Sequence, residues 1–280
     1  MEIRVKGRFL RELKNQKLAI AGLTATSLFV LISISVPLFP IPDPFALSFR
    51  PFQPPSRQHI MGTDNLGRDI FSRVLWGTRA SLLVGVLSAG LSAAIGILVG
   101  AIAGYFRGWL DDLLSRTIDV FLVMPIFFLL ILIVSLFGSH IFFVILAIGM
   151  VTWPRNARLM RAQALSLRSR AYVTAAIGSG ASQLRVLFLH VVPNGVSPVI
   201  AYAVLLVGTS ILVEAGLSFL GLGDPNVISW GQMIRAGQQS FTTAWWMSFF
   251  PGLMLLILVS AINYFGDGLS VVLNPRMIRQ

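Results

Sequence analysis

Two glycines in a polar stretch near the N-terminus have the spacing of a phosphate-binding loop. Gly62 and Gly67 match the Gly-x-x-x-x-Gly part of a P-loop. A P-loop then needs lysine followed by serine or threonine, because these side chains reach the phosphates and Mg²⁺. Arg68 and Asp69 occupy those two places, and no buried strand precedes the segment. We therefore expect this chain to bind no nucleotide.

The sequence also lacks the residues that metal binding and redox chemistry need. The chain contains no cysteine, so it has neither thiolate ligands nor disulfides. His59, His140 and His190 are far apart in sequence and form no His-x-x-x-His pair, the helical spacing typical of zinc sites. The sequence predicts no metal ion and no cofactor on this chain.

Few ionisable side chains lie in or beside the apolar runs: Arg116, Asp119, Glu214 and Asp267. Charge inside a membrane is by default a hint of function, such as a proton relay or a substrate contact. Arg116 and Asp119, however, are three residues apart on one expected helix, where side chains meet, so we expect them to pair with each other. Structural anchoring is the favoured role for all four.

The composition is that of a membrane protein. Hydrophobic residues make up 55% of the 280 residues and charged residues only 12%, with a mean hydropathy of +0.80. Soluble domains carry about 25% charged residues. The formal charge of +11 could indicate nucleic-acid binding, but the basic residues flank apolar runs, as in cytoplasmic loops of membrane proteins. Two such groups are Arg4, Lys6, Arg8, Arg11, Lys14 and Lys17, and Arg155, Arg158, Arg161, Arg168, Arg170 and Arg185.

The apolar runs predict an all-α membrane protein with six transmembrane helices and both termini in the cytoplasm. The first run is too long for a signal peptide and lacks a cleavage site. Lys and Arg are more frequent in the segments that this topology places inside. Trp245 and Trp246 stand before the last span, where an interfacial position is expected. The six spans are expected at 18–39, 80–104, 113–137, 141–162, 196–213 and 247–265.

The third and fourth spans are open to two interpretations. Residues 113–137 are long enough to cross, but 141–153 are few before Pro154 and Arg155. One long span over 121–153 would put the basic residues on its two sides in different compartments. Two spans that turn at 138–140, the fourth continuing past a kink at Pro154, keep both groups inside, and this topology is favoured.

Small residues mark the second span. Gly96, Gly100 and Gly104 form two overlapping Gly-x-x-x-Gly steps, a strip where another helix can approach closely. That helix can belong to this chain or to a partner. Before this span, a proline-rich stretch from Pro37 to Pro55 lacks the amide donors for a regular helix and should form an extended loop.

The stretch between the fourth and fifth expected spans resembles the "EAA" loop of ATP-binding-cassette importer permeases. The matching residues are Ala175, Ala176, Gly180, Ala181 and Pro193, while Thr174 stands where the family has glutamate. The resemblance implies a cytoplasmic coupling helix that docks into a separate ATPase. Small residues here favour a short helix–turn–helix. Helical spacing predicts that Leu184, Leu187, Phe188 and Val191 seat it against the membrane helices.

A second stretch, residues 61–73, resembles the outer-loop signature of the dipeptide, oligopeptide and nickel importer permeases. We call it the signature segment. The matching residues are Gly62, Thr63, Asp64, Gly67, Arg68, Asp69, Ser72 and Arg73. Three further matches follow in the family's order, around Asp112–Asp119 with Pro125, Leu217–Gly223 with Trp230-Gly231, and Gly266–Gly268 with Asn274-Pro-Arg276. Together they cover the chain from about residue 61 to its end.

The resemblance implies a type I ABC importer permease fold in a bacterial or archaeal cell membrane. Expected partners are a homologous second permease, two ATPase subunits that hold ATP and Mg²⁺, an extracytoplasmic substrate-binding protein and membrane lipid, with no nucleic acid. The chain itself is expected to be non-catalytic, and to import peptides or, alternatively, a nickel chelate or glutathione. The expected parts are a basic cytoplasmic or interfacial segment 1–17, a first helix 18–39, an outer proline-rich loop 40–79, a five-helix core 80–270 with a coupling loop 166–193, and a cytoplasmic tail 271–280.

Two other classes compete with this interpretation. A self-sufficient secondary transporter should show paired intramembrane carboxylates or broken, repeated helices. A membrane-embedded enzyme should show a cluster of His, Asp or Ser at bilayer depth. The sequence contains no evident example of either pattern.

Overall fold

The structure, a computed structural model, describes residues 16–273, and within this range its regular elements are helices. The only β pairing in the described part of the chain is an isolated bridge between Thr63 and Asp69. Nearly all of the predicted basic segment 1–17 lies outside the described residues. The same holds for most of the tail 271–280, including the Asn274-Pro-Arg276 match.

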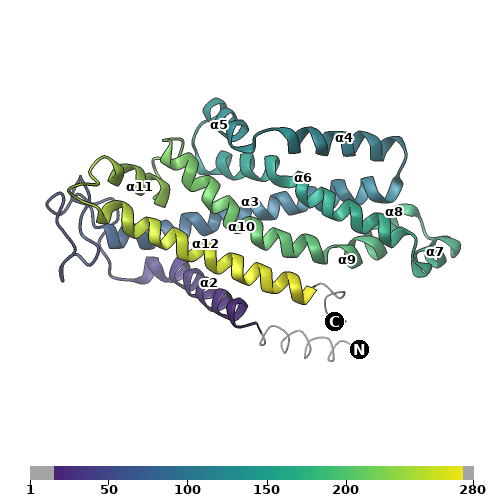
Figure 1. The fold of residues 1–280 in the computed structure, drawn as a ribbon, viewed down its shortest axis with the longest axis horizontal. Coiled ribbons are helices and arrows are strands. Elements are labelled where there is room, and N and C mark those ends of the chain that lie inside the picture. The colour runs from purple at the N-terminus through teal and green to yellow at the C-terminus, as the bar shows by residue number, and fades with distance from the viewer. Residues whose placement is uncertain (1–15, 274–280) are drawn as a thin grey trace.

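Long helices run lengthwise through the molecule (Figure 1): α2 (Lys17–Ser35), α3 (Ile70–Phe106), α6 (Ile141–Arg168), α10 (Ser197–Phe219) and α12 (Trp246–Leu273). Helix α3 packs along α6, and α12 packs against α2 and α10. The start of α2 lies beside the end of α12, because Gly268 contacts Ala19. The two ends of the described chain therefore meet on one side of the bundle.

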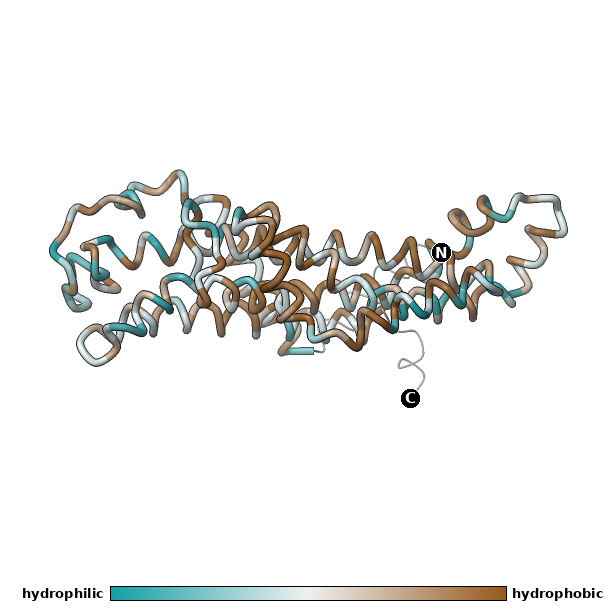
Figure 2. Tube along the Cα trace, turned by 90° about the horizontal axis from the view of Figure 1, so that it is seen from above, coloured by the Kyte–Doolittle hydropathy of each residue, from teal (hydrophilic) through white to brown (hydrophobic). Residues whose placement is uncertain are grey.

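Four helices are long and apolar enough to cross a membrane: α2 with the 3₁₀ turn Val36–Leu38, α3, α10 and α12. Figure 2 shows the hydrophobic residues concentrated in the middle of the molecule, with a hydrophilic end beyond them. Helix α3 has 37 residues, about 55 Å at 1.5 Å per residue, whereas the bilayer core is about 30 Å thick. The span predicted at 80–104 is thus part of a helix that projects beyond the bilayer core.

The prediction of one continuous third span at 113–137 is wrong. Two helices, α4 (Trp109–Val123) and α5 (Ile126–Phe137), occupy this stretch and are bent by 90° relative to each other. The bend falls at Pro125, which lacks an amide hydrogen and forces Met124 out of the helical region, to φ −70° and ψ 135°. Neither helix alone is long enough to cross.

The chain turns after Phe137 and enters α6, which continues through Pro154 as far as Arg168. The expected turn at 138–140 and the continuation past Pro154 are therefore present. The described part of the chain has four candidate spans, or five if the bent α4–α5 pair is one span. Helix α6 is outside that count and carries several arginines in its second half, so six spans remain a prediction.

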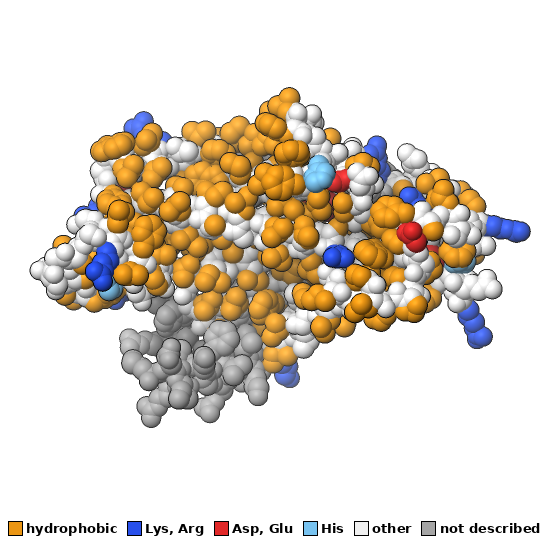
Figure 3. Space-filling view, turned by 180° about the vertical axis from the view of Figure 1, so that it is seen from behind, with side chains coloured by type: hydrophobic (Ala, Val, Ile, Leu, Met, Phe, Trp, Pro, Cys, Tyr) orange, Lys and Arg blue, Asp and Glu red, His pale blue; other side chains and the backbone are white. Residues whose placement is uncertain are grey.

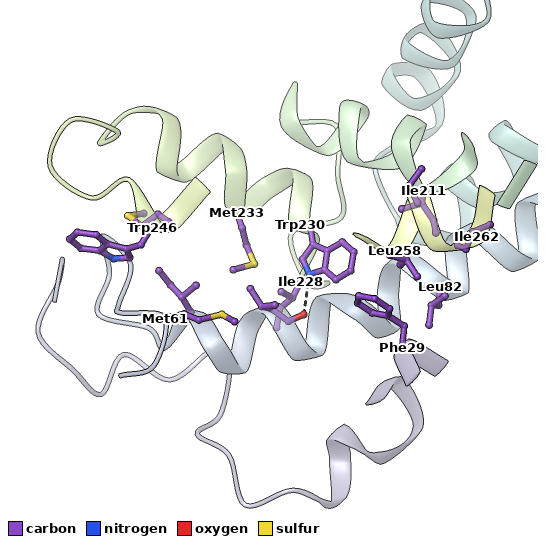
Figure 4. Close-up of a cluster of buried hydrophobic side chains, with 14 of the residues drawn as sticks. Phe29, Met61, Leu82, Ile211, Ile228, Trp230, Met233, Trp246, Leu258 and Ile262 are labelled. Carbon is purple, nitrogen blue, oxygen red and sulfur yellow. Dashed lines mark hydrogen bonds between the residues drawn. The ribbon is translucent and has the colours of Figure 1, made fainter. Parts of the chain in front are cut away.

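Hydrophobic side chains form a buried cluster at one end of the bundle, which no pattern in the sequence predicts (Figure 4). A short helix, α11 (Trp230–Gln238), folds back over α3 and α12. Its Trp230 is fully buried and donates a hydrogen bond from Nε1 to the carbonyl oxygen of Val74, at 3.0 Å. Trp246 is also buried and donates to the carbonyl oxygen of Thr63, at 3.1 Å. Of the pair expected at the membrane interface, only Trp245 is exposed.

Candidate functional site

The loop at residues 166–193 lies at the far end of the bundle from α11 (Figure 1) and folds as a helix, a turn and a second helix. Helix α7 spans Ala171–Gly178 and α8 spans Gln183–Val186. A π turn, Leu187–Val191, leads into the short α9, Val192–Gly195, in which Pro193 stands near the start. Pro193 fits there because the first turn of a helix needs no amide donor.

Gly180 ends α7 in the left-handed conformation, with φ +85°. Its amide donates to the carbonyl of Ile177 at 3.0 Å, and the amide of Ala181 donates to the carbonyl of Ala176 at 3.2 Å. This pair of bonds is a Schellman motif, in which glycine is favoured because other residues are strained at positive φ. A Cβ atom built on Gly180 would meet no atom of the described chain within 4 Å, its two chain neighbours apart. The apex of the loop is therefore open on the outside.

The loop is anchored by four side chains with no exposed surface: Val173, Val186, Leu187 and Val191. They pack against α3 and α6 residues such as Ala101 and Met160. The predicted anchors Leu184 and Phe188 are wrong, since they are 59% and 47% exposed. The π turn explains the difference, because a wider turn breaks the i, i+4 spacing on which that prediction relied.

Tyr105, near the end of α3, joins the loop to the long helices. Its hydroxyl donates to Gln183 Oε1 at 2.6 Å, and its carbonyl oxygen accepts from Arg168 Nη1 at 2.6 Å. The Arg168 guanidinium also lies 5.6 Å from the centre of the Tyr105 ring, a cation–π distance. Displacement of α8 must therefore act on the ends of both α3 and α6. No sequence motif indicates this junction.

The outer face of the 166–193 loop is exposed and partly apolar. Thr174, Ala175, Gly180 and Pro193 are exposed, while Ala176 and Ala181 are half-buried. Five large apolar side chains on the same loop are also exposed: Tyr172, Ile177, Leu184, Phe188 and Leu189. An anchored inner face with an exposed apolar outer face is typical of a surface that contacts another protein.

The glycine strip of α3 packs within the chain, against α6. A Cβ atom built on Gly96 would collide with Asn156, one on Gly100 with the carbonyl of Ala157, and one on Gly104 with the carbonyl of Arg161. The backbones are thus too close for any larger residue. Beside the strip, buried Asn156 donates from Nδ2 to Ser92 Oγ at 2.9 Å. Of the two possibilities that the sequence left open, the structure has the contact inside this subunit.

The prediction of an ion pair between Arg116 and Asp119 is wrong. Asp119 instead accepts from Arg158 of α6 at 2.6 Å, with both side chains 62% exposed. On one helix, an ion pair is weaker when the basic residue precedes the acidic one, as Arg116 precedes Asp119. Arg158 of α6 is a closer cation. Arg161 makes a second bridge to α4, with its Nε and Nη2 2.6 and 2.8 Å from the two carboxylate oxygens of Asp111.

Glu214 is buried in α10, and its Oε1 accepts a 2.6 Å hydrogen bond from Ser218 Oγ one turn later. Asp267 is exposed on α12. No group of three or more potential metal ligands occurs within residues 16–273.

The signature segment holds the first turn of α3. Asp69 precedes the helix, and its Oδ1 accepts from the amide of Ser72 at 2.8 Å, which is an N-cap. Its Oδ2 lies 3.3 Å from His59 Nδ1. Asp64 accepts from the amides of Leu66 and Arg68 at 2.9 Å. A carboxylate thus occupies the helix N-terminus, the place that a P-loop offers to a phosphate.

The same segment ties down the proline-rich loop. Ser72 Oγ donates to the carbonyl of Pro42 at 2.6 Å, and Arg73 Nη1 donates to that of Pro44 at 2.9 Å. Gly62 and Gly67 both have φ +77°, and a Cβ on Gly67 would collide with the carbonyl of Phe49. The two glycines therefore serve tight turns that bring the loop against α3.

Comparison with known proteins decides which family shares this arrangement. Residues 96–279, which contain the glycine strip and the 166–193 loop, match the family described as "Binding-protein-dependent transport system inner membrane component". The chain belongs to this family.

Curated relatives of the family are similar over nearly the whole chain. The dipeptide transport system permease protein DppC of Alkalihalophilus pseudofirmus is 38% identical, over 95% of this chain and 88% of that protein. A Sinorhizobium fredii protein named "probable peptide ABC transporter permease protein" is 41% identical, over 97% of this chain and 93% of that one. Such coverage includes the signature segment as well as the family match.

A solved structure of the MetNI methionine ABC transporter, in an inward-facing conformation, has a chain with a similar fold. The TM-score is 0.59 at 18% identity, over 72% of this chain and 96% of that chain. At this identity the likeness concerns the fold alone. The expected fold, that of a type I ABC importer permease, is thereby confirmed for this family member, and the chain is a multi-pass membrane protein.

Proposed function

We propose that this chain is a permease subunit of an ATP-driven peptide importer, and that it performs no bond chemistry itself. The observation that carries the proposal is the 166–193 loop, anchored by fully buried side chains and tied to α3 and α6, with an exposed apex. The peptide cargo is suggested by the names of the relatives, which are dipeptide and peptide permeases. Nickel chelates and glutathione are the alternative cargoes.

The working complex contains a homologous second permease, two ATPase subunits that bind ATP and Mg²⁺, and an extracytoplasmic substrate-binding protein. It resides in a bacterial or archaeal cell membrane, the inner membrane in a Gram-negative cell, and this chain binds no cofactor. ATP-driven closure of the ATPases moves the 166–193 loop. Because α8 is bonded to Tyr105 and through it to Arg168, that motion reaches the long helices and opens the pathway to one side or the other.

Uptake into proteoliposomes tests the proposal. The complex, with its binding protein outside and ATP inside, should accumulate a labelled dipeptide or tripeptide, and omission of ATP or of the binding protein should abolish uptake. Uptake by this chain alone, driven by an ion gradient, would instead establish a secondary transporter. Saturable ATP binding by the isolated subunit would also contradict the proposal.

The orientation can be tested because the chain has no cysteine of its own. Ser56 and Ser179 are both exposed. Ser56 belongs to the loop before α3 and Ser179 follows α7, and these two segments lie at opposite ends of the bundle (Figure 1). In intact cells an impermeant thiol reagent should label Ser56→Cys, and it should label Ser179→Cys only after permeabilisation. Labelling of residue 179 from outside would reverse the orientation and remove the 166–193 loop from the ATPases.

A further inference from the structure

A surface pit of about 170 Å³ opens beside the signature segment, between α3, α11 and the 225–228 loop. Phe45 and Pro225 on its lining are exposed, whereas Ile70 and Met247 are almost fully buried. The pit therefore has an exposed apolar rim and descends to buried residues. The close-up of the same end of the bundle shows Ile228 and Met233, which also line the pit (Figure 4).

Two arginines face one carboxylate in this pit. Arg68 donates from Nε to Asp64 Oδ2 at 2.6 Å, and Arg73 Nε lies 3.9 Å from the same oxygen. The other carboxylate oxygen of Asp64 is already used by two backbone amides. Two cations and one anion leave a formal excess of one positive charge, and Asp64 has little capacity left for a further donor.

Arg73 is the less satisfied of the two arginines. Its side chain is only 8% exposed, and within residues 16–273 its one hydrogen bond runs from Nη1 to the carbonyl of Pro44. A guanidinium has five N–H donors, and a buried charge is stable only when paired and hydrogen-bonded. Beyond Asp64, the remaining N–H donors of Arg73 can serve a second anionic acceptor, and a carboxylate matches the planar, forked geometry of arginine.

The volume of the pit leaves room for such an anion. About 170 Å³ is ample space for a carboxylate on a short methylene stem. Apolar rim residues such as Phe45 and Pro225 suit the stem.

We infer that this pit receives the carboxylate of an Asp or Glu side chain of the extracytoplasmic substrate-binding protein when that protein docks. The inference rests on the proposed function. The lining residues of the pit come from the 40–69 loop, the start of α3, the 225–228 loop, α11 and the start of α12. This end of the molecule is hydrophilic and lies beyond the hydrophobic middle, where lipid would compete (Figure 2). A single acidic side chain inserted between two arginines would fix the docking register and speed encounter, the usual effects of charge complementarity.

A charge placed inside the pit tests the inference. Ala236 lines it from α11 and is half-buried. Ala236→Glu supplies a competing carboxylate, and Ala236→Gln adds nearly the same shape without the charge. In the reconstituted complex, the concentration of binding protein that gives half-maximal ATPase stimulation should rise about tenfold or more with Glu and less than about threefold with Gln.

The unaltered complex provides a second arm that does not depend on how a variant folds. Acetate should raise the half-maximal concentration of binding protein more than chloride of equal ionic strength, and acetamide should leave it unchanged. Equal effects of Ala236→Glu and Ala236→Gln, or of acetate and chloride, would overturn the inference.

Two other results would bear on a different role for the pit or on the proposed function. Loss of the second permease from the purified complex with Ala236→Glu, and not with Ala236→Gln, would move the pit to the permease interface and overturn the inference. If the unaltered complex shows no response to any binding protein, the proposed function itself fails. If it responds and only the charge tests fail, the proposed function stands without this docking site.

Discussion

The signature segment and the 166–193 loop, at opposite ends of the long helices, differ in how much of their surface the chain itself covers. Thr63, Asp64, Asp69 and Ser72 are all buried and hydrogen-bonded within the chain. In the 166–193 loop, by contrast, only the inner face is buried and the apex is exposed. The first end is hydrogen-bonded within the chain apart from the donors of Arg73 that face the pit. The second end presents a whole exposed face to a partner.

This difference indicates where motion enters the molecule. A segment whose backbone and carboxylates are hydrogen-bonded within the chain has little to gain from rearrangement. A helix–turn–helix held on one face can move with the protein that binds its other face. The two ends are connected by α3, which is capped by Asp69 at its start and contains Tyr105 in its last turn. Substitutions in the connecting helices should therefore disrupt the structure of both ends. Substitutions in the signature segment should lower stability, whereas substitutions in the 166–193 loop should impair coupling to the ATPase.

The largest effect is expected from Gly100→Leu, in the contact that holds α3 to α6. A Cβ at this position would collide with the carbonyl of Ala157, a backbone atom that cannot move aside. We expect the free energy of unfolding to fall by about 3 kcal/mol, the upper part of the range for overpacked cores. Size-exclusion chromatography of the fluorescently tagged protein should show loss of the monodisperse species.

Gly90→Leu is the matched control, because Gly90 is on the same helix and a Cβ there would meet nothing within 4 Å. It should accumulate normally. Normal accumulation and transport by Gly100→Leu would mean that the close approach of α3 and α6 is not maintained in the membrane, and that both ends tolerate a shift between them.

The next largest effect is expected from Gly180→Trp, at the apex of the 166–193 loop. A Cβ atom there would meet no atom of the described chain within 4 Å, its two chain neighbours apart. The residue sits at φ +85°, where a non-glycine residue is strained by about 1 kcal/mol. The subunit should insert normally and lose transport, because the indole occupies space that the ATPase needs. Subunit ratios in the purified complex and uptake in vesicles measure the two effects.

Gly180→Ala separates strain from bulk, since alanine has the same backbone strain without the indole. It should retain most of the transport. Equal loss with Ala and Trp would show that the turn geometry matters and not the contact, and full transport with Trp would place the ATPase contact elsewhere.

Two of the features compared here could be predicted from the sequence, because close helix contacts and tight turns both require glycine. The sequence predicted a helix contact at Gly96, Gly100 and Gly104, where the helices approach closely, and a turn at Gly180, where φ is positive. The sequence could not predict which helix packs against these glycines, because the spacing on one helix does not identify the second helix.

What the sequence could not provide was arrangement across elements. The bend at Pro125 follows from local chemistry that the hydropathy of 113–137 masked. The pairing of Asp119 with Arg158 depends on α4 lying along α6. The anchors of the 166–193 loop shifted because a π turn interrupts the helical period. Helix α11 has only nine residues, too few for a periodic pattern to stand out.

A smaller effect is expected from Asp69→Ala, at the internally satisfied end. The substitution removes the N-cap of α3 and the contact with His59, and loss of such a cap costs about 1–2 kcal/mol. Stability in thermal unfolding should fall, while the number of ATP molecules hydrolysed per peptide imported should stay constant. Asp69→Asn keeps an acceptor for the Ser72 amide and should be less destabilising. A changed ATP-to-peptide ratio would give this end a role in coupling and remove the contrast with the 166–193 loop.

The smallest effect is expected from Thr174→Glu, which places the glutamate of the "EAA" pattern in α7. Thr174 is exposed, and its only side-chain hydrogen bond within the described chain is a long one, 3.4 Å, to the carbonyl of Arg170. An acidic residue near the start of a helix is favourable, so stability should change by less than about 0.5 kcal/mol. If the ATPase offers a cation to this position, the glutamate should also reduce dissociation of the ATPase from the purified complex. Thr174→Gln has the same length without the charge and should leave dissociation unchanged. A loss of transport with Glu but not with Gln would mean that the partner surface is acidic here, and that the exposed end was selected for threonine because a carboxylate is repelled.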